Sequence, residues 1–576
     1  MSGNTEIAPR RETQHRGFDL ILLASIWIAM LLVVNPIGDF PLNDDWTYAL
    51  VVKNFLETGD FRPSWWVGAQ ILTNVLWGAL FCFIPGFSFT ALRISTLVAS
   101  LLAIFGCYVL LRELRAPRWY ALVATLTLAF NPIYYELSLT FMTDVLFLTL
   151  TLWSAVFFTR SLTYGGHINM AIATIFSLFA ALSREIGLCI PVAFFAAHLF
   201  HNRRAYRQLI ISLIPSVVCV VSFVAFKLWL VGTGRTQGLS DPTTDRILAA
   251  LTNTNSLFIF LSTNVYIALL YLGLFLLPVV FVLPYRDRIM GRTARLSAVG
   301  ASIFLCCFCL HAVYVGDNSH AVMPVGGNIL AAFGLGPIVL RDVVYLNLNV
   351  PPPLPPVFWI SVTALGVLGA IFAIIQLTKI ASSGRPGDIP ERVPSIVQRF
   401  FGTVTTLYFV PVLLTNPLFD EYLLPLIPFI SATLVPRALL LPSLKGRKFS
   451  LPPLTLLLVG FGVYAVFGTR DYLMLNRVRW TALSTLQRDL HVGPADIDGG
   501  YEFNGWYLFD PNHVVQFNSI GKERSFWWVV RDDYLLTLGP VPGYKILRRY
   551  SYENWLPPRT QRVTVLRRTE PSKSKY

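Results

Sequence analysis

Long apolar runs separated by short polar turns fill the sequence between residues 20 and 467. Hydrophobic residues make up 54% of the 576 residues and charged residues only 14%, which is too few to cover an ordinary surface facing water. Several runs approach the ~20 apolar residues that an α-helix needs to cross a bilayer. The sequence therefore predicts an all-α polytopic membrane protein.

The positive charges indicate how the predicted spans are oriented. Lys and Arg number 46 against 32 Asp and Glu, and the net charge of +14 lies in short clusters between apolar runs. This placement favours membrane topology and argues against a nucleic-acid partner. Basic residues such as Arg16 precede the first run, at 20–34, so we expect a cytoplasmic N-terminus. Continuing the alternation gives about thirteen spans and an extracytoplasmic C-terminus.

The first outer loop covers residues 38–90 and contains an apolar stretch of its own, at 67–84. If this stretch crossed the membrane, the basic segment 112–118 would lie outside the cytoplasm, against the positive-inside rule. We therefore interpret 67–84 as an interfacial or re-entrant helix, although the sequence alone does not decide whether it crosses.

The end of the chain has the composition of a water-soluble domain. Strand-like runs at 525–530 and 561–566 alternate with Gly and Pro turns. We expect a transmembrane domain over 1–468 and a small α/β extracytoplasmic domain over 469–576.

Two adjacent carboxylates stand out in the first outer loop, within Asn43-Asp44-Asp45-Trp46-Thr47-Tyr48. They precede a helical pattern that ends at Gly59 and is typical of a helix lying on the membrane surface. Asp44 could cap this helix by accepting a backbone N–H, or it could face a cavity and act as a base. The two roles are open and do not exclude each other.

Asp144, Arg184 and Glu185 are further ionisable residues at the predicted outer face. Asp144 begins a span, where it either caps the helix or joins the acidic loop in one site. Arg184 and Glu185 lie between two apolar runs with almost no loop, and ionisable residues in such places are costly and therefore candidates for function. The alternative for Arg184 is an internal ion pair with Glu185 or Asp144.

Four weaker candidates complete the set. Arg235 and Arg470 are more simply interpreted as solvated charges at the interface, and Tyr422 as a member of the aromatic belt. His320 with Asp317 would make a poor metal site. No pattern requires a cofactor, and a divalent cation is compatible with the sequence without being demanded by it.

These motifs resemble, in their order and topology, the integral-membrane GT-C glycosyltransferases. The acidic loop at Asp44, the Asp144 loop and the segments 182–188 and 422–428 are similar to bacterial relatives of the protein O-mannosyltransferases and of the lipid A aminoarabinose and galacturonic acid transferases. Segment 497–506 resembles the outer domain of some bacterial members. Together these likenesses extend over most of the chain.

The sequence also departs from that family at two places. Ser64-Trp65-Trp66-Val67-Gly68 stands where family members often have His-Pro-Pro-Leu, and Glu421 stands where many have Arg. The departures leave the acceptor class and a phosphate role for the second position open.

The resemblance implies a GT-C fold in a multi-pass protein of the bacterial inner membrane. The implied reaction moves a sugar from a polyprenyl-phosphate donor to an acceptor hydroxyl of a lipid, glycan or protein, with inversion. Asp44 is then the expected general base and Asp45 positions the acceptor or a partner loop. The expected donor- or acceptor-binding residues are Asp144, Arg184, Glu185, Arg235, Tyr422 and Arg470, with Arg184 the first candidate to receive the departing lipid phosphate.

A polytopic secondary transporter or flippase of a lipid-linked or anionic substrate is the alternative. Transporters often show internal repeats and place charged sites near the midplane, whereas the ionisable residues here gather at the outer ends of the spans. The sequence does not reveal the sugar, the acceptor, a metal requirement or the oligomeric state.

Overall fold

The computed structural model describes residues 7–63, 66–67, 70–235, 254–284, 292–314, 322–382, 393–441, 451–510 and 527–569. Eight helices in these ranges are long and apolar enough to cross a membrane. They are α1 (Ile7–Val34), α4 (Phe89–Glu113), α7 (Thr143–Tyr164), α10 (Tyr206–Gly232), α12 (Thr254–Phe281), α15 (Pro356–Ser382), α16 (Ser395–Leu413) and α19 (Leu451–Asp489). The predicted all-α polytopic membrane architecture is confirmed, while the count of thirteen spans stays a prediction.

Shorter helices connect and flank the spans. They are α2 (Asp45–Thr58), α3 (Leu72–Cys82), α5 (Arg118–Ala129), α6 (Pro132–Leu137), α8 (His167–Ala181), η1 (Glu185–Leu188), α9 (Cys189–His201), α14 (Arg341–Val344), η3 (Asp420–Leu423), α17 (Leu426–Thr433), α18 (Val435–Ala438) and α20 (Tyr501–Leu508), together with the longer α13 (Arg292–Tyr314). At ~1.5 Å per residue α3 is only about half as long as the hydrocarbon core is thick. It cannot cross the membrane as a helix.

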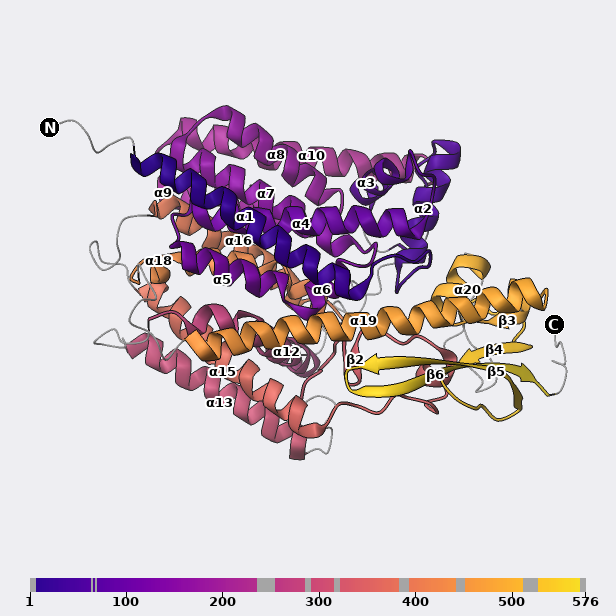
Figure 1. Cartoon of the computed structure of the whole chain (residues 1–576). Coiled ribbons are helices and arrows are strands. Elements are labelled where there is room, and N and C mark those ends of the chain that lie inside the picture. Colours follow the sequence, from indigo (N-terminus) through magenta and orange to yellow (C-terminus); the bar gives the residue numbers. More distant parts are fainter. Residues whose placement is uncertain are drawn as a thin grey trace.

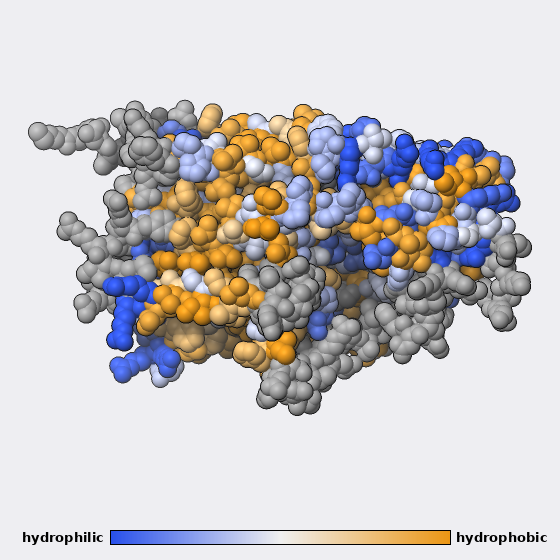
Figure 2. All heavy atoms as spheres, turned by 90° about the horizontal axis from the view of Figure 1, so that it is seen from below, coloured by the Kyte–Doolittle hydropathy of each residue, from blue (hydrophilic) through white to orange (hydrophobic). Residues whose placement is uncertain are grey.

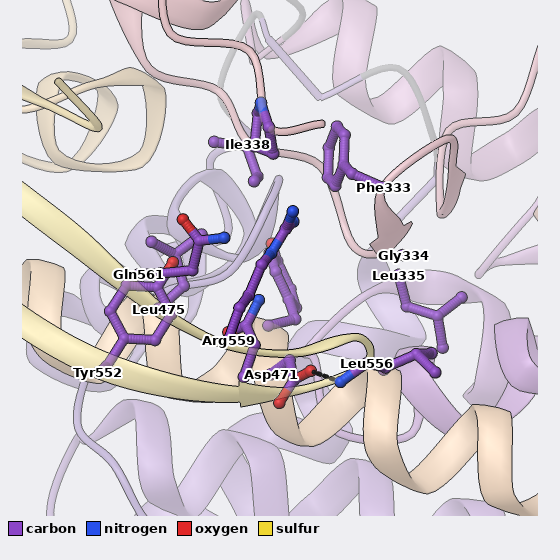
Figure 3. A pocket seen from close by; sticks show the side chains of 14 residues that line it. Phe333, Gly334, Leu335, Ile338, Asp471, Leu475, Tyr552, Leu556, Arg559 and Gln561 are labelled. Carbon is purple, nitrogen blue, oxygen red and sulfur yellow. Dashed lines mark hydrogen bonds between the residues drawn. The ribbon is translucent and has the colours of Figure 1, made fainter. Parts of the chain in front are cut away.

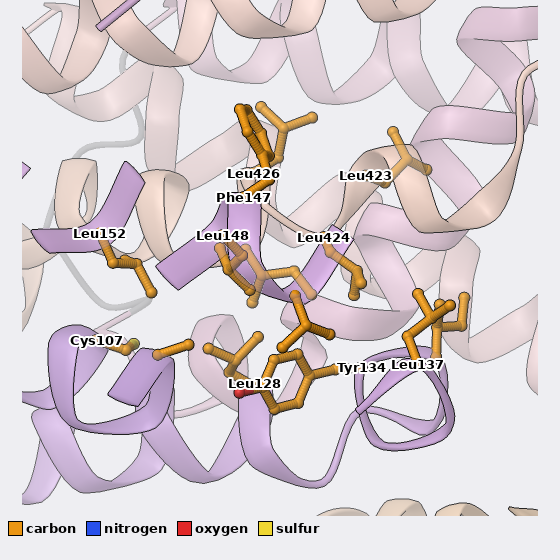
Figure 4. Close-up of a cluster of buried hydrophobic side chains, with 14 of the residues drawn as sticks. Cys107, Leu128, Tyr134, Leu137, Phe147, Leu148, Leu152, Leu423, Leu424 and Leu426 are labelled. Atoms are coloured by element: carbon orange, nitrogen blue, oxygen red, sulfur yellow. The ribbon is translucent and has the colours of Figure 1, made fainter. Parts of the chain in front are cut away.

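Segment 422–440, which we counted as one of the about thirteen predicted spans, is a series of short helices instead of one long helix. Pro425 precedes α17, and Pro428 and Pro436 lie in the first turns of α17 and α18, where a missing N–H is tolerated, so each proline marks the start of a new helix. This segment nevertheless packs in the bundle core. Figure 4 shows its side chains Leu424 and Leu426 in one apolar cluster with Leu148 of α7 and Tyr134 of α6.

The depth of each span in the bundle differs strongly. In α7, 67% of the most apolar window is buried inside the protein, whereas in α10 the share is 22%. Helix α7 is therefore central and α10 faces the lipid. Hydrophobic side chains cover much of the bundle surface seen in Figure 2, as a membrane-embedded protein requires. The N-terminal end of α7, where Asp144 lies, is thus set deep among its neighbours.

The C-terminal part of the chain, called the outer domain after its predicted position, is built on a four-stranded sheet. The strands are β3 (Ile497–Asp498), β4 (Tyr534–Thr537), β5 (Tyr544–Trp555) and β6 (Pro558–Arg568), in the order β3-β4-β6-β5. β3 and β4 are parallel and the other neighbours antiparallel. The predicted run 561–566 falls within β6, whereas 527–530, the described part of the run 525–530, is not a strand.

Helix α19 joins the bundle to this sheet without a break, as Figure 1 shows. Residue 469, the predicted start of the outer domain, lies within α19. Asp471 of α19 accepts the backbone N–H groups of Trp555 and Leu556 at the turn between β5 and β6 (Figure 3). A cavity of about 40 Å³ lies beside this contact, lined by α19, the β5–β6 hairpin and the small hairpin of β1 (Leu330–Ala331) and β2 (Gly334–Leu335).

Candidate functional site

Asp44 stands at the N-cap position of α2, yet its side chain makes no capping hydrogen bond. Its Oδ1 accepts a short hydrogen bond from the hydroxyl of Tyr501, the first residue of α20. The indole N–H of Trp66 donates to the same hydroxyl at 2.6 Å. The geometry thus excludes a side-chain capping role for Asp44. Burial raises the pKa of Asp44 above its ordinary value, and the hydrogen bond from Tyr501 opposes that effect.

Asp45 is committed to holding two loops together. Its Oδ1 accepts the N–H of Phe141, in the loop before α7, at 2.7 Å, and its Oδ2 accepts the N–H of Leu42 at 3.2 Å. The side chain is almost fully buried, and burial raises its pKa to about 7 against the opposing charge of Arg93. Asp45 therefore fixes the acidic loop against the loop that leads to Asp144.

Arg184 is held at the N-terminal end of α7. Its guanidinium lies 2.9 Å from Asp144 Oδ1, its Nε donates to the hydroxyl of Thr143 at 2.8 Å, and its plane lies over the ring of Tyr422, 5.5 Å from the centroid. The side chain of Asp144 is 3% exposed and that of Arg184 is 17% exposed. The ion pair is thus buried on the carboxylate side and open on the guanidinium side.

Tyr48 of α2 links the two groups of residues. Burial raises the pKa of Tyr48 well above its ordinary value, and the charges of Asp44, Arg184 and Asp144 all act on its hydroxyl. The structure therefore brings together four of the sequence candidates, Asp44, Asp144, Arg184 and Tyr422. The sequence analysis missed Tyr48, because its position among apolar residues of one helix face reads as packing.

The other candidates lie in separate contacts. Glu185 forms an ion pair with Lys227 of α10 and accepts a hydrogen bond from Gln70 at 3.3 Å. Arg235 pairs with Asp60, beyond the end of α2, at 2.8 Å. Arg470 donates to the carbonyl of Glu553 and lies over the ring of Trp555, so it supports the hairpin of the outer sheet.

Glu136 of α6 is a buried acid near the site that the sequence analysis did not select. Burial raises the pKa of Glu136 well above its ordinary value, and the charges of Asp45, Asp420 and Asp144 add to the effect. Neither of its carboxylate oxygens has a hydrogen-bond partner among the described residues. A lone Glu in an apolar stretch is the signal that could have identified it.

In the described ranges no three His, Cys, Asp or Glu side chains are grouped closely enough to hold a metal ion. His320 and Asp317 lie outside the described residues.

An apolar groove of about 630 Å³ runs along the bundle between α3, α4, α7 and α8. The groove residues on α7 follow Thr143 at helical spacing; they are Leu146, Leu150, Trp153 and Phe157. The Thr143 hydroxyl, which accepts a hydrogen bond from Arg184, therefore lies on the face of α7 that lines the groove.

The start of α3 is tied to the turn that leads to Arg184. Thr73 donates its hydroxyl to the carbonyl of Phe179 at 2.7 Å, and Ser183 donates to Asn74 at 2.7 Å. One end of the groove therefore reaches the segment that contains Arg184.

Comparison with known proteins gives one sequence match and several distant structural ones. The sequence model of the dolichyl-phosphate-mannose-protein mannosyltransferase family matches residues 75–229, which include Asp144 and Arg184. A search of curated protein sequences finds no match.

The solved structures that resemble the chain are distant in sequence. ArnT from Cupriavidus metallidurans bound to undecaprenyl phosphate is 12% identical, with a TM-score of 0.38, covering 96% of this chain and 99% of ArnT. The apo state of the same protein is 12% identical, with a TM-score of 0.32, covering 95% of this chain and 97% of ArnT. The oligosaccharyltransferase of Archaeoglobus fulgidus is 14% identical, with a TM-score of 0.33, covering 81% of this chain and 55% of the oligosaccharyltransferase. These TM-scores are low, so the resemblance rests on the sequence match. The predicted resemblance is confirmed over residues 75–229, where the chain is similar to the dolichyl-phosphate-mannose-protein mannosyltransferase family.

Proposed function

We propose that this protein transfers a sugar from a polyprenyl-phosphate donor to an acceptor hydroxyl at the outer face of the membrane, with inversion at the anomeric carbon. The observation that carries the proposal is that Asp45, next to Asp44, is hydrogen-bonded at 2.7 Å to the loop before α7, where Arg184 pairs with Asp144 at 2.9 Å. The family matched over residues 75–229 is named for a dolichyl-phosphate sugar, which belongs to the same donor class.

The donor reaches the site through the bilayer in this proposal. A polyprenyl chain is apolar and would fit the groove between α3, α4, α7 and α8, whose wall is almost entirely hydrocarbon. The phosphate at the head of that chain would then lie near Thr143 and Arg184. An Arg fork binds phosphate oxygens in two places at once, which suits this end of the groove.

Asp44 acts as the general base. As the acceptor oxygen attacks the anomeric carbon, Asp44 takes the hydroxyl proton and the bond from the anomeric carbon to the phosphate oxygen breaks. The raised pKa of Asp44 brings the carboxylate closer to the working pH, where a base is most effective. Such assistance contributes roughly two to four orders of magnitude in rate.

Arg184 stabilises the charge that gathers on the departing lipid phosphate. Its pairing with Asp144 and Thr143 fixes the guanidinium before the substrate arrives, so little reorganisation is needed in the transition state. Asp45 keeps the acidic loop and the Asp144 loop in register through its two backbone hydrogen bonds.

We propose the bacterial inner membrane as the location, with the N-terminus in the cytoplasm and the site and outer sheet on the other side. The acceptor belongs to one of three classes, a lipid, a glycan or a protein.

The experiment uses the purified protein in proteoliposomes with polyprenyl phosphates that carry different sugars and with lipid, glycan and peptide acceptors. Asp44→Asn should lower kcat by roughly 10² to 10⁴. Asp60→Asn is the matched control, because Asp60 belongs to the same outer loop but pairs with Arg235. Transfer by Asp44→Asn at the wild-type rate would remove Asp44 from the mechanism.

A further inference from the structure

We infer that Tyr501 is a positioning residue for Asp44, an outer-domain hydroxyl that keeps the carboxylate ionised and correctly aimed. The inference rests on the proposed role of Asp44 as base. It adds a function for the outer domain, which would complete the site instead of only covering it.

The direction of the hydrogen bond between Tyr501 and Asp44 is fixed by a third residue. The Trp66 indole can only donate, and it donates to the Tyr501 oxygen at 2.6 Å. Tyr501 has a single hydroxyl proton, and the carboxylate of Asp44 is the acceptor on its other side. Trp66 thus orients the hydroxyl, and the hydroxyl orients Asp44.

The ring of Tyr501 has little freedom to move. It is 7% exposed and packs against Trp46 and Trp527, with centroids 5.8 Å and 5.5 Å away. Its backbone N–H donates to the carbonyl of Val339 at 3.0 Å. A side chain fixed on its ring, backbone and hydroxyl can hold Asp44 in one orientation.

Helix α20 is itself anchored in the outer domain. Glu502 forms an ion pair with Arg479 of α19 at 2.7 Å, and Asn504 donates to Asp498 of β3 at 2.8 Å. The outer sheet and α19 therefore fix the position of the Tyr501 hydroxyl. This hydroxyl donates to the carboxylate of Asp44, at the N-terminus of α2.

The hydrogen bond matters because negative charges act on Asp44. Glu502 of α20, Asp144 of α7 and the adjacent Asp45 all disfavour its ionised form, and burial does the same. The positive groups nearby are already engaged with these carboxylates: Arg184 pairs with Asp144, Arg479 pairs with Glu502, and the charge of Arg93 acts on Asp45. Tyr48 and Tyr422 are neutral phenols. A hydrogen bond to the charged form opposes these effects.

The test is the pH profile of kcat for Tyr501→Phe, which keeps the ring and removes the hydroxyl. Loss of one hydrogen bond to a carboxylate raises its pKa by about one unit, so the acid limb of the kcat profile, which reports Asp44, should move to higher pH by about one unit in Tyr501→Phe. At a pH well below the acid limbs of both proteins, kcat of the variant should be about tenfold lower than kcat of wild type. Tyr507→Phe, on the exposed side of the same helix, is the control and should keep the wild-type profile.

Other outcomes overturn the inference. An unchanged acid limb means that Tyr501 does not act on Asp44, and a uniform loss of kcat at all pH values, with a lowered Tm, means a purely structural role. A rise in activity would mean that Tyr501 blocks the acceptor. If Tyr501→Phe fails to fold, Trp66→Phe should move the limb in the same direction by a smaller amount, and no movement would count against the inference.

The Asp44→Asn result separates this inference from the proposed function. An inactive Asp44→Asn with an unchanged limb in Tyr501→Phe refutes only the role of Tyr501. An active Asp44→Asn refutes the base itself.

Discussion

The stability of the protein should depend on pH through Asp45 in a way that one substitution can isolate. Asp45 is 2% exposed and accepts two backbone N–H groups, and burial raises its pKa to about 7 from the ordinary 3.8. The perturbation is Asp45→Asn, which keeps the size of the side chain and removes its titration.

The size of the effect follows from proton linkage. Because Asp45 binds a proton more readily in the folded protein than in the unfolded chain, the folded state loses stability as the pH rises from about 4 to about 7. A shift of about three units at ~1.4 kcal/mol each amounts to about 4 kcal/mol above pH 7, and the effect vanishes below pH ~4. Asn offers one acceptor oxygen to two N–H groups, which lowers the stability by about 1–3 kcal/mol at every pH.

The assay is thermal unfolding in detergent, followed by tryptophan fluorescence between pH 4.5 and 8. Asp45→Asn should have a lower Tm than wild type at pH 4.5, and the difference should shrink and then reverse as the pH rises. Asp60→Asn is the control. The hydrogen bond from Arg235 lowers the pKa of Asp60, so Asp60 is ionised in both the folded and the unfolded chain between pH 4.5 and 8, and the Tm difference between this variant and wild type should stay constant across the range. A difference between Asp45→Asn and wild type that is constant across the range would refute the reasoning.

Three further substitutions test the site. Arg184→Gln should lower kcat more than tenfold and weaken the binding of polyprenyl phosphate measured by native mass spectrometry, whereas Arg184→Lys should keep part of both the rate and the binding. Wild-type binding of polyprenyl phosphate by Arg184→Gln would contradict the phosphate role. Leu150→Trp should fill the groove and raise the KM for the lipid donor several-fold, whereas Leu213→Trp on the lipid-facing surface of α10 should not; equal KM values would show that the donor chain lies elsewhere. Gly505→Ala would place a Cβ 2.4 Å from the Trp46 ring, so it should displace α20 and lower both Tm and kcat; an unchanged Tm would mean that the contact yields easily.

The gathering of Asp44, Asp144 and Arg184 could be predicted from the sequence because topology alone places them at one face. Positive charges sort the ends of the spans, and each of the three residues stands at the outer end of an apolar run. The ion pair between Arg184 and Asp144 was one of two pairings that the sequence left open, since spacing does not say which carboxylate the fork meets.

The contact of Asp44 with Tyr501 could not be predicted from local pattern. The two residues are 457 positions apart, and a Tyr beside Gly500 at the start of a short helix looks like an ordinary packing residue. The partners of Arg235 and Arg470 were equally hidden. The prediction of one span at 422–440 was wrong, although the three prolines in this segment argue against one continuous helix.

The 39 residues of α19 amount to a rod of about 58 Å, roughly twice the thickness of the hydrocarbon core. One end is set among the spans and the other carries the sheet that supports Tyr501. Because the helix is uninterrupted, the packing of its first half in the bundle fixes the height and the rotational position of the outer domain. Removing one residue from the middle of α19 would turn everything beyond it by about 100° and draw it in by ~1.5 Å. The alignment of the Tyr501 hydroxyl with the Asp44 carboxylate therefore depends on the helical phase of α19. A membrane of different thickness would tilt α19 and change the angle of this hydrogen bond.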